Sequence, residues 1–367
     1  MENELLYTLA LSLIPNLKKT EARQILEEVD TIEDLFNESY LKSNANFHPK
    51  ICTQLLENNL LEKARTELAQ AKASGLTLYS IQNESYPYRL KECLDAPLIL
   101  YSKGVCDLNA SRIISIVGTR HATPYGRDLT KTLVKQLAEY DPNILIVSGL
   151  AYGIDVIAHQ SAMEYGLKTV AIMAHGLQAV YPSSHLKHAH EIVQKEGAIL
   201  SELPWGIAPE PYRFLQRNRI IAGLCDVCVV IESGLTGGSM KTARDARDYN
   251  REVLTFPGRI NDTFSLGCNT LVVNLVAEMI QSAKDLFQKM NWDLPTKSNK
   301  QGSLFAELNE KQKKLLKLLS QTDEQRIHEL MNQLEWSIQE TQLILTELEI
   351  EGLIEKRPGG TYRKFIN

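Results

Sequence analysis

A series of short apolar runs between residues 113 and 256 constrains the fold of this chain most strongly. Continuous apolar runs of this length are typical of strands that are buried on both faces of a sheet. Segments with helical spacing of apolar residues separate the runs, so the sequence predicts a doubly wound, parallel α/β sheet. The expected strands are Ile113–Val117, Ile144–Val147, Thr169–Met173, Ala198–Ser201, Val227–Glu232 and Glu252–Phe256.

The flanking segments have a different pattern. Residues 1–75 show helical spacing, as at Leu5, Leu9 and Leu13, and predict a small helical domain. Residues 13–26 resemble a helix-hairpin-helix or SAM-like module, but lack the glycines with which a hairpin approaches phosphate. We therefore expect a helical domain (1–75), a sheet domain (76–290), a polar linker (291–308), and a winged helix (309–367) of three helices and a hairpin.

The charge of the chain is unevenly distributed. The formal net charge is 40 − 45 = −5. Residues 1–110 carry 11 basic and 16 acidic residues, residues 111–290 carry 18 and 17, and residues 291–367 carry 11 and 12. This balance excludes a histone-like protein but allows a local basic groove outside the acidic first third.

Several patterns argue against a membrane, disulfide or metal protein. No apolar run approaches the ~18–20 residues that span a bilayer, so we expect a cytoplasmic protein without membrane contact. The Cys225–Cys228 pair runs into a predicted strand, which favours buried thiols over a metal site. His185, His188 and His190 are expected to form a solvent-facing helix start, and no metal site is predicted.

Three of the predicted strands end in small-residue turns that open helices. These turns contain Gly118, Thr119 and Arg120; Ser148 and Gly149; and Gly237, Gly238 and Ser239. Ligands bind beyond the carboxyl ends of parallel strands, and a helix N-terminus attracts anions. The spacing matches neither a dinucleotide fingerprint nor a P-loop, so we expect an anion site without a cofactor.

A basic and aromatic segment precedes the fifth predicted strand. Its aromatic rings can stack on bases, and its arginines can neutralise phosphates. Because the following Ile220–Ala222 predicts a buried face, we expect the arginines to share the opposite, exposed face. The alternative is a solvated helix face with extended arginine side chains. The segment contains Tyr212, Arg213, Phe214, Gln216, Arg217, Asn218 and Arg219.

An ordered set of motifs resembles the DNA-processing protein A family, DprA, also called Smf. The resemblance is dense over about residues 80–290, and the flanking modules match the three-domain form of that family more weakly. The motifs are IVGTR (116–120), SGLAYGIDVIAH (148–159), YP (181–182), SELPWG (201–206), FLQRNRIIAGL (214–224), GGS (237–239), PG (257–258) and GCNTLV (267–272).

The resemblance implies a function without a chemical step. Members of this family bind single-stranded DNA on an extended Rossmann-like domain, which the doubly wound sheet of this chain would form. They form homodimers through that domain, and they load the recombinase RecA on incoming strands during natural transformation while protecting the DNA. For this chain, it implies phosphate contacts from Arg120 with Thr119 beside it, and from Gln216, Arg217, Asn218 and Arg219. It also implies backbone donors or close approach at Gly118, Ser148, Gly149, Gly238 and Ser239, and stacking by Phe214.

Two alternatives remain open. Lys241 stands where the family commonly has an apolar residue, and it is either an added phosphate contact or a solvated charge. The turn at Gly237–Ser239 after Glu232 also resembles the phosphate-binding turn of lysine-decarboxylase-like phosphoribohydrolases, which are nucleotide-processing enzymes. The arginine-rich segment favours an extended polyanion over a single nucleotide.

Overall fold

The computed structural model describes residues 2–43, 49–56, 59–294, 309–320, 325–350, 353–357 and 360–364. The chain divides into two units, residues 1–294 and residues 295–367, and each is described separately below. Most of the predicted linker (291–308) lies outside the described residues.

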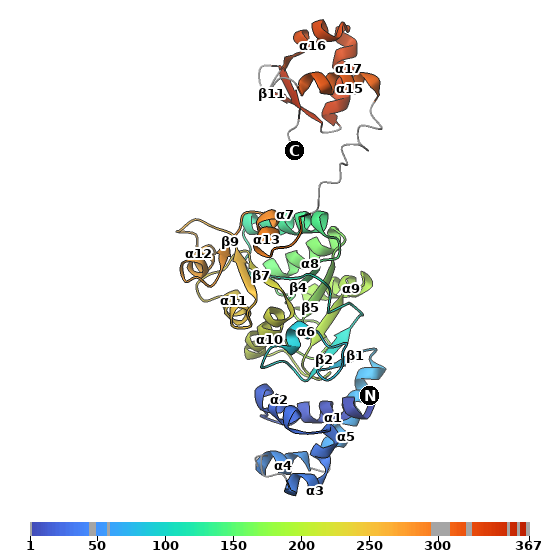
Figure 1. Ribbon diagram of the computed structural model, residues 1–367, viewed down its shortest axis with the longest axis vertical. Coiled ribbons are helices and arrows are strands. Elements are labelled where there is room, and N and C mark those ends of the chain that lie inside the picture. Colours follow the sequence, from blue (N-terminus) through green and yellow to red (C-terminus); the bar gives the residue numbers. More distant parts are fainter. Residues whose placement is uncertain are drawn as a thin grey trace. The chain divides into compact units, whose positions relative to one another are not determined.

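A nine-stranded sheet forms the centre of the first unit (Figure 1). All six predicted strands are present and parallel to one another. The predicted parallel, doubly wound sheet is therefore confirmed. These strands are β3 (Ile113–Val117), β4 (Leu145–Ser148), β5 (Lys168–Ile172), β6 (Ala198–Ser201), β7 (Val227–Val230) and β8 (Glu252–Thr255).

Three short strands that the sequence analysis did not predict extend the sheet at its edges. β1 (Thr77–Ser80) pairs antiparallel with β2 (Ile99–Lys103), which pairs antiparallel with β6. β9 (Glu278–Met279) joins β8 at the opposite edge. The strand order is β1-β2-β6-β5-β4-β3-β7-β8-β9.

Strand order reverses at β3, because the chain builds outward through β4, β5 and β6 and then returns to place β7 on the other side of β3. In an open α/β sheet, the loops at such a switch point diverge and leave a crevice beyond the carboxyl ends of the strands. The three small-residue turns predicted to bind an anion follow β3, β4 and β7. The topology therefore brings them to the same crevice.

Helices cover both faces of the sheet, and alternate residues of a strand face opposite layers. Ile114 and Ile116 of β3 pack in one buried cluster, and Ile113 and Val117 belong to the other. The first cluster includes residues of α7 (Pro124–Tyr140), α8 (Ile154–Glu164) and α13 (Ala283–Lys289), and the second includes α10 (Pro211–Leu224) and α11 (Gly238–Asp248). The remaining helices of this layer structure are α6 (Tyr88–Lys91), α9 (Leu186–Gln194) and α12 (Leu266–Val273), with a 3₁₀ turn at Ser183–His185.

The N-terminal helices pack against the β1–β2 edge within the same unit. The guanidinium of Arg23 donates to the carbonyl oxygens of Lys91 and Cys93, at 2.6 and 2.7 Å. The carboxylate of Glu67 accepts the backbone N–H of Trp205 at 2.7 Å. The elements are α1 (Glu2–Ser12), α2 (Lys19–Glu28), a 3₁₀ helix (Ile32–Phe36), α3 (Glu38–Ser43), α4 (Pro49–Leu55) and α5 (Leu60–Ala73).

The second unit has the predicted winged-helix arrangement. A three-stranded sheet of order β10-β12-β11 packs with three helices around Leu316, Leu330 and Leu345. Residues 358–359, which come between the two strands of the hairpin in the sequence, lie outside the described residues. The elements are α15 (Glu310–Leu319), β10 (Gln325–Arg326), α16 (Ile327–Leu334), α17 (Ile338–Ile350), β11 (Ile354–Arg357) and β12 (Thr361–Lys364).

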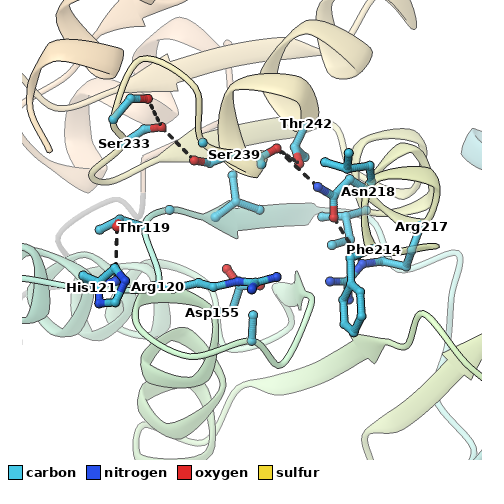
Figure 2. Close-up of a pocket in the computed structure, with 18 of the residues that line it drawn as sticks. Thr119, Arg120, His121, Asp155, Phe214, Arg217, Asn218, Ser233, Ser239 and Thr242 are labelled. Carbon is cyan, nitrogen blue, oxygen red and sulfur yellow. Dashed lines mark hydrogen bonds between the residues drawn. The ribbon is translucent and has the colours of Figure 1, made fainter. Parts of the chain in front are cut away.

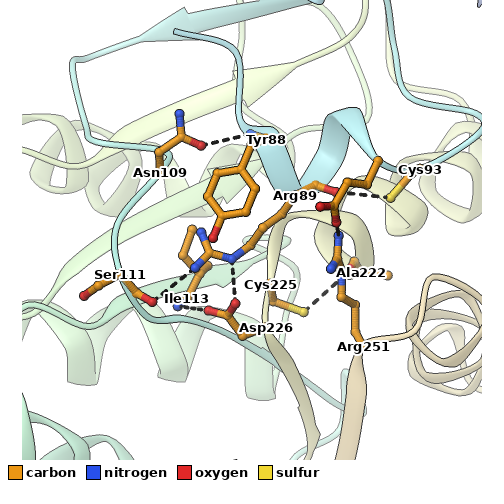
Figure 3. A network of polar contacts seen from close by, with 11 residues as sticks. Tyr88, Arg89, Cys93, Asn109, Ser111, Ile113, Ala222, Cys225, Asp226 and Arg251 are labelled. Atoms are coloured by element: carbon orange, nitrogen blue, oxygen red, sulfur yellow. Dashed lines mark hydrogen bonds and ion pairs between the residues drawn. The ribbon is translucent and has the colours of Figure 1, made fainter. Parts of the chain in front are cut away.

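A buried ion pair fixes α6 to the start of the sheet (Figure 3). Arg89 is 2% exposed, and its Nε donates to Oδ1 of Asp226 at 2.6 Å. The second carboxylate oxygen of Asp226 accepts the backbone N–H of Ile113 at 2.8 Å. Arg251 donates to the carbonyl oxygen of Arg89. One carboxylate thus joins α6, β3 and the start of β7.

We predict that Asp226→Ala lowers the free energy of unfolding by about 3–5 kcal/mol, because it leaves the Arg89 guanidinium buried without its counter-charge. Denaturant unfolding measures the change. The matched control is Asp128→Ala, since Asp128 is exposed on α7, and its effect should stay within about 0.5 kcal/mol. Equal effects of the two substitutions would contradict the structural role of the ion pair.

Candidate functional site

A hollow of about 270 Å³ lies at the switch point of the sheet (Figure 2). Its walls are formed by the turns after β3 and β7, one side of α10, and the first turns of α8 and α11. It therefore combines the predicted small-residue turns with the predicted basic segment. Its lining includes Gly118, Thr119, Arg120, His121, Asp155, Phe214, Arg217, Asn218, Ser233, Gly237, Gly238, Ser239 and Thr242.

Arg120 supplies an unpaired positive charge to this hollow. Among the described residues, its guanidinium has no hydrogen bond or ion pair, and its carbon Cζ lies 5.7 Å from the centre of the Phe214 ring. The ring of Phe214 in turn lies 5.5 Å from that of Tyr181, which is half exposed. Figure 2 shows the Arg120 side chain extended across the hollow toward Phe214 and Arg217. An exposed cation beside one ring, with a second ring next to the first, is suited to a phosphate with an adjoining base.

Arg217 is buried, so the prediction that the arginines share an exposed face is wrong. The residue is 5% exposed, and its Nη1 donates to the carbonyl oxygens of Gly149 (2.8 Å) and Ile172. Arg217 precedes the buried Ile221 by four residues, which places both on one face of α10. The long side chain reaches carbonyl groups at the ends of β4 and β5, which satisfy its charge. Burial lowers the pKa of Arg217 to about 10, although Asp155 opposes the shift.

Arg219 is also turned away from the hollow. Its guanidinium forms ion pairs with Glu202 (2.5 Å) and Asp95 (3.7 Å), and its side chain is 11% exposed. Glu202 also lies 3.7 Å from the ammonium group of Lys19 in α2. Arg219 therefore links α10 to β6 and to the N-terminal helices instead of lining the predicted site.

The other predicted residues fall into two groups. Gly118, Thr119, Phe214, Asn218, Gly238 and Ser239 line the hollow together with Arg120 and Arg217. Ser148 is buried and donates to the carbonyl oxygen of Ile116 at 2.6 Å. Gln216 and Lys241 are exposed outside the lining, and Lys241 donates to both carboxylate oxygens of Asp245 at 2.7 Å.

The glycines of the turns are required by protein packing. A Cβ atom on Gly149 would lie 2.5 Å from Nη1 of Arg217, and one on Gly118 would lie 2.5 Å from the Ile154 side chain. Gly153 has a φ of +79°, and its Cβ would meet the carbonyl oxygen of Thr119. Gly238 differs, because only Nδ2 of Asn218, at 3.4 Å, approaches its Cβ position. The turns are therefore tightly packed before any ligand is present.

The N-terminus of α11 contributes polar groups to the hollow. No side chain caps this helix, and its Gly238 and Ser239 line the hollow. The hydroxyl groups of Ser233 and Ser239 lie 2.8 Å apart, and Nδ2 of Asn218 donates to the carbonyl oxygen of Gly238 at 3.2 Å. Uncapped N–H groups at a helix N-terminus favour an anion.

Asp155 and His159 do not form an accessible acid–base pair. Burial raises the pKa of Asp155, while Arg217 and the backbone N–H of Ala151 act in the opposite direction. His159 is fully buried, and its Nδ1 lies 2.7 Å from the hydroxyl of Thr169. Burial lowers the pKa of His159 to about 3, with Arg217 adding to the shift. Asp155 lines the hollow, whereas His159 does not.

The remaining sequence patterns lie outside the hollow. Cys225 and Cys228 are buried, as predicted. The expectation of a solvent-facing histidine turn is wrong for His185, which is 6% exposed and bonded to the carbonyl oxygen of Leu150 at 2.9 Å. Within the described ranges, no group of three or more histidine, cysteine or acidic side chains is placed to hold a metal. No helix in those ranges is long and apolar enough to cross a membrane.

Two residues near the hollow had no predicted role. His121 lines it directly behind Arg120, and Tyr181 contacts Phe214. The sequence placed Tyr181 in a short motif with Pro182 but gave no partner for its ring. That contact joins residues 33 positions apart and depends on the tertiary fold.

Comparisons with known proteins agree with the fold and with the resemblance. Residues 77–291 match the family model of the DNA recombination-mediator protein A, and residues 303–360 match the model of a DprA winged helix domain. A DprA relative from Mycobacterium tuberculosis is 39% identical over 202 residues, which cover 54% of this chain and 51% of the relative. The chain thus spans about half the length of that relative. DNA processing protein DprA of Bacillus subtilis is 35% identical over 61% of this chain and 74% of its own length.

Two solved structures are similar to this chain over more than half of its length. DNA processing protein A from Streptococcus pneumoniae has a TM-score of 0.57 and 28% identity, with 74% of this chain and 98% of the other covered. DNA processing protein A from Helicobacter pylori has a TM-score of 0.53 and 32% identity, with 59% and 95% covered. The latter structure concerns the single-stranded DNA binding mode of the Helicobacter protein.

We predict that Gly149→Ala destabilises the protein by about 1–3 kcal/mol, because the added methyl group displaces the buried guanidinium of Arg217. Gly238→Ala is the matched control in the neighbouring turn, and its stability should be unchanged or slightly higher. Chemical denaturation of both variants measures the difference. A Gly149→Ala protein as stable as the control would show that Arg217 does not depend on this space.

Proposed function

We propose that this chain, which belongs to the DNA recombination-mediator protein A family, binds single-stranded DNA with little sequence preference and passes it to the recombinase RecA. The match to the family model covers more than half of the chain and establishes membership. A role in DNA processing and recombination follows from the family. The observation that carries the proposed binding activity is the unpaired Arg120 guanidinium beside Phe214, in the same hollow as an uncapped helix N-terminus.

Each part of the hollow has a separate task in this proposal. Arg120 and the N-terminus of α11 bind a phosphate, and the rings of Phe214 and Tyr181 stack with an adjoining base. Neither interaction reads the edge of a base, so the same contacts suit any sequence. The wall next to the DNA backbone is formed by Gly118, Thr119, Gly238 and Ser239.

In this proposal, the basic segment of α10 mainly holds the turns of the hollow in place and contributes less to direct contact with DNA. Arg217 holds the turn at Gly149 through its bonds to carbonyl groups, and Asn218 holds Gly238. Gln216 and Lys241 lie at the exposed margin, where they extend the contact with the strand. Arg219 braces α10 against Glu202, so we assign it to stability and not to phosphate binding.

The alternative function, hydrolysis of a nucleotide as in phosphoribohydrolases, needs a free acidic group after β7. Glu232 is 4% exposed, and its two oxygens accept the N–H and the hydroxyl of Thr123 at the start of α7. It is also absent from the lining of the hollow. We therefore propose a binding protein without a chemical step.

A homodimer through the sheet domain is part of the proposal. Val273, Leu275 and Met279 expose 79%, 83% and 48% of their surface at the end of α12 and on the edge strand β9. Exposed apolar side chains at a sheet edge favour association with a second surface. Transfer to RecA during natural transformation and protection of incoming DNA rest on the resemblance to the family, and the proposed cytoplasmic location rests on the hydropathy of the sequence. A pull-down and a strand-exchange assay with RecA test the transfer step, and failure of both would contradict it.

Arg120→Ala should weaken binding of an oligothymidylate and make its salt dependence shallower. Each neutralised phosphate contributes about −0.7 to the slope of log affinity against log salt for a single strand. We expect the slope to change by about 0.7 in this variant, because one phosphate loses its cation. A fluorescence titration over a range of salt concentrations measures it.

Arg247→Ala is the control, since Arg247 is equally a surface arginine but lies at the far end of α11. Its slope should match that of the parent protein. Binding that is independent of salt, or release of a base from a nucleoside monophosphate, would contradict the proposed function.

Val273→Glu should convert the proposed dimer into a monomer, because a carboxylate would have to be buried without a partner in the interface. Light scattering coupled to size exclusion measures the mass. Val105→Glu is the control, since Val105 is 76% exposed in a different part of the sheet domain. A parent protein that is already monomeric at micromolar concentration would refute the dimer.

A further inference from the structure

A second groove, of about 910 Å³, lies next to the candidate site and is not explained by it. The loop after β8 and the start of α7 form its walls. Tyr125 and Phe264 place aromatic rings in the groove, and Arg259 lies at its exposed rim. Its volume is within the ~300–1,000 Å³ typical of ligand pockets.

The groove is held in shape by hydrogen bonds within the protein. The hydroxyl of Tyr125 donates to the carbonyl oxygen of Pro257 at 3.2 Å, so its ring is tied to the opposite wall. The backbone N–H of Ser233 donates to the carbonyl oxygen of Phe264 at 2.7 Å. Asn269 of α12 bonds both the N–H and the carbonyl oxygen of Gly258. A binding surface that is ordered in advance loses less entropy when a ligand binds.

The groove adjoins the candidate site, because the segment that leads from β3 into α7 and the turn after β7 contribute to the walls of both. In the loop between β3 and α7, residues 118–121 line the hollow and residues 123–125 line the groove. In the turn after β7, Ser233 faces the hollow and Glu232 faces the groove. The rings of His121 and Phe264 stack across the boundary, with centres 6.3 Å apart and planes 28° apart.

One cation of the groove is available to an anionic ligand. Among the described residues, the guanidinium of Arg259 has no hydrogen bond or ion pair. The carboxylate of Glu232 is occupied by Thr123, as described above, and does not face a ligand as a free acceptor. Asp262 is the other acidic group of the lining, and it is exposed. The groove therefore has an unpaired arginine and two aromatic rings in its lining, as the first site has Arg120, Phe214 and Tyr181.

We propose that this second groove binds the next nucleotides of the same single strand, with bases against Phe264 and Tyr125 and a phosphate at Arg259. The strand then runs along the carboxyl edge of the sheet, from the ends of β3 and β4 to the ends of β7 and β8. This inference rests on the proposed single-strand binding and adds a second subsite to it. A short oligonucleotide occupies the first hollow alone, and a longer one occupies both.

A length series tests the subsite. Affinities of oligothymidylates of about 4, about 8 and about 16 nucleotides are measured for the parent protein, Arg259→Ala and Phe264→Leu. Leucine keeps apolar volume in the wall but removes the ring. We expect both variants to bind the shortest oligonucleotide normally and the longest one about fivefold or more weakly, because base stacking and one phosphate contact are lost only there.

Arg120→Ala and Arg247→Ala complete the set. The first should weaken binding at every length, and the second should change none. Thermal unfolding of each variant verifies that the fold is retained, and Phe264→Tyr should restore the affinity for long strands because it restores a ring.

Losses that are equal at all lengths, or no loss at the longest one, would overturn the second subsite. Photo-crosslinking with iododeoxyuridine gives an independent readout. Crosslinks to residues 257–265 should appear only with the longer strands, and crosslinks confined to the first hollow at every length would also overturn it. If Arg120→Ala affects no length, the proposed function itself fails, whatever the result at Arg259.

Discussion

The architecture of the candidate site depends on one buried cation, the guanidinium of Arg217. It donates to carbonyl groups at the ends of β4 and β5 and lies in the field of the buried Asp155. A buried charge without such partners would be strongly destabilising, so the three elements that supply them must stay together. The same guanidinium fills the space where any side chain on Gly149 would project. The position of α10 relative to the turns therefore follows from satisfying Arg217.

The arginines of this region divide into those that serve the protein and those available to a ligand. Arg217 and Arg219 are bonded to carbonyl or carboxylate oxygens, whereas the partner of Arg120 among the described residues is the Phe214 ring. Charges already neutralised by the protein add little to the attraction of a distant anion. A chain with a net charge of −5 can thus present a localised positive site, because a few unpaired cations lie at one edge of its sheet.

Much of the fold could be predicted from the sequence. Buried parallel strands need apolar residues on both faces, so a continuous apolar run such as Ile113–Val117 predicts a buried strand. The edge strands escaped prediction because β9 has two residues and β1 and β2 pair antiparallel outside the alternating region. The turns that follow β3, β4 and β7 could also be associated with one another in advance, since parallel strands bring their carboxyl ends to one edge.

The sequence by itself determined the composition of the site: small residues after three strands, an arginine in the first turn, and a basic and aromatic helix between two strands. Only the tertiary structure decided which side chains face a ligand. Arg213, Arg217 and Arg219 are alike as residues, yet the rotation of α10 and the reach of each side chain bury Arg217 and Arg219 against different partners. Three features depend on contacts between segments that are far apart in the sequence: the packing of the glycine turns, the Phe214–Tyr181 contact, and the groove beside Phe264. A local sequence pattern does not predict such contacts.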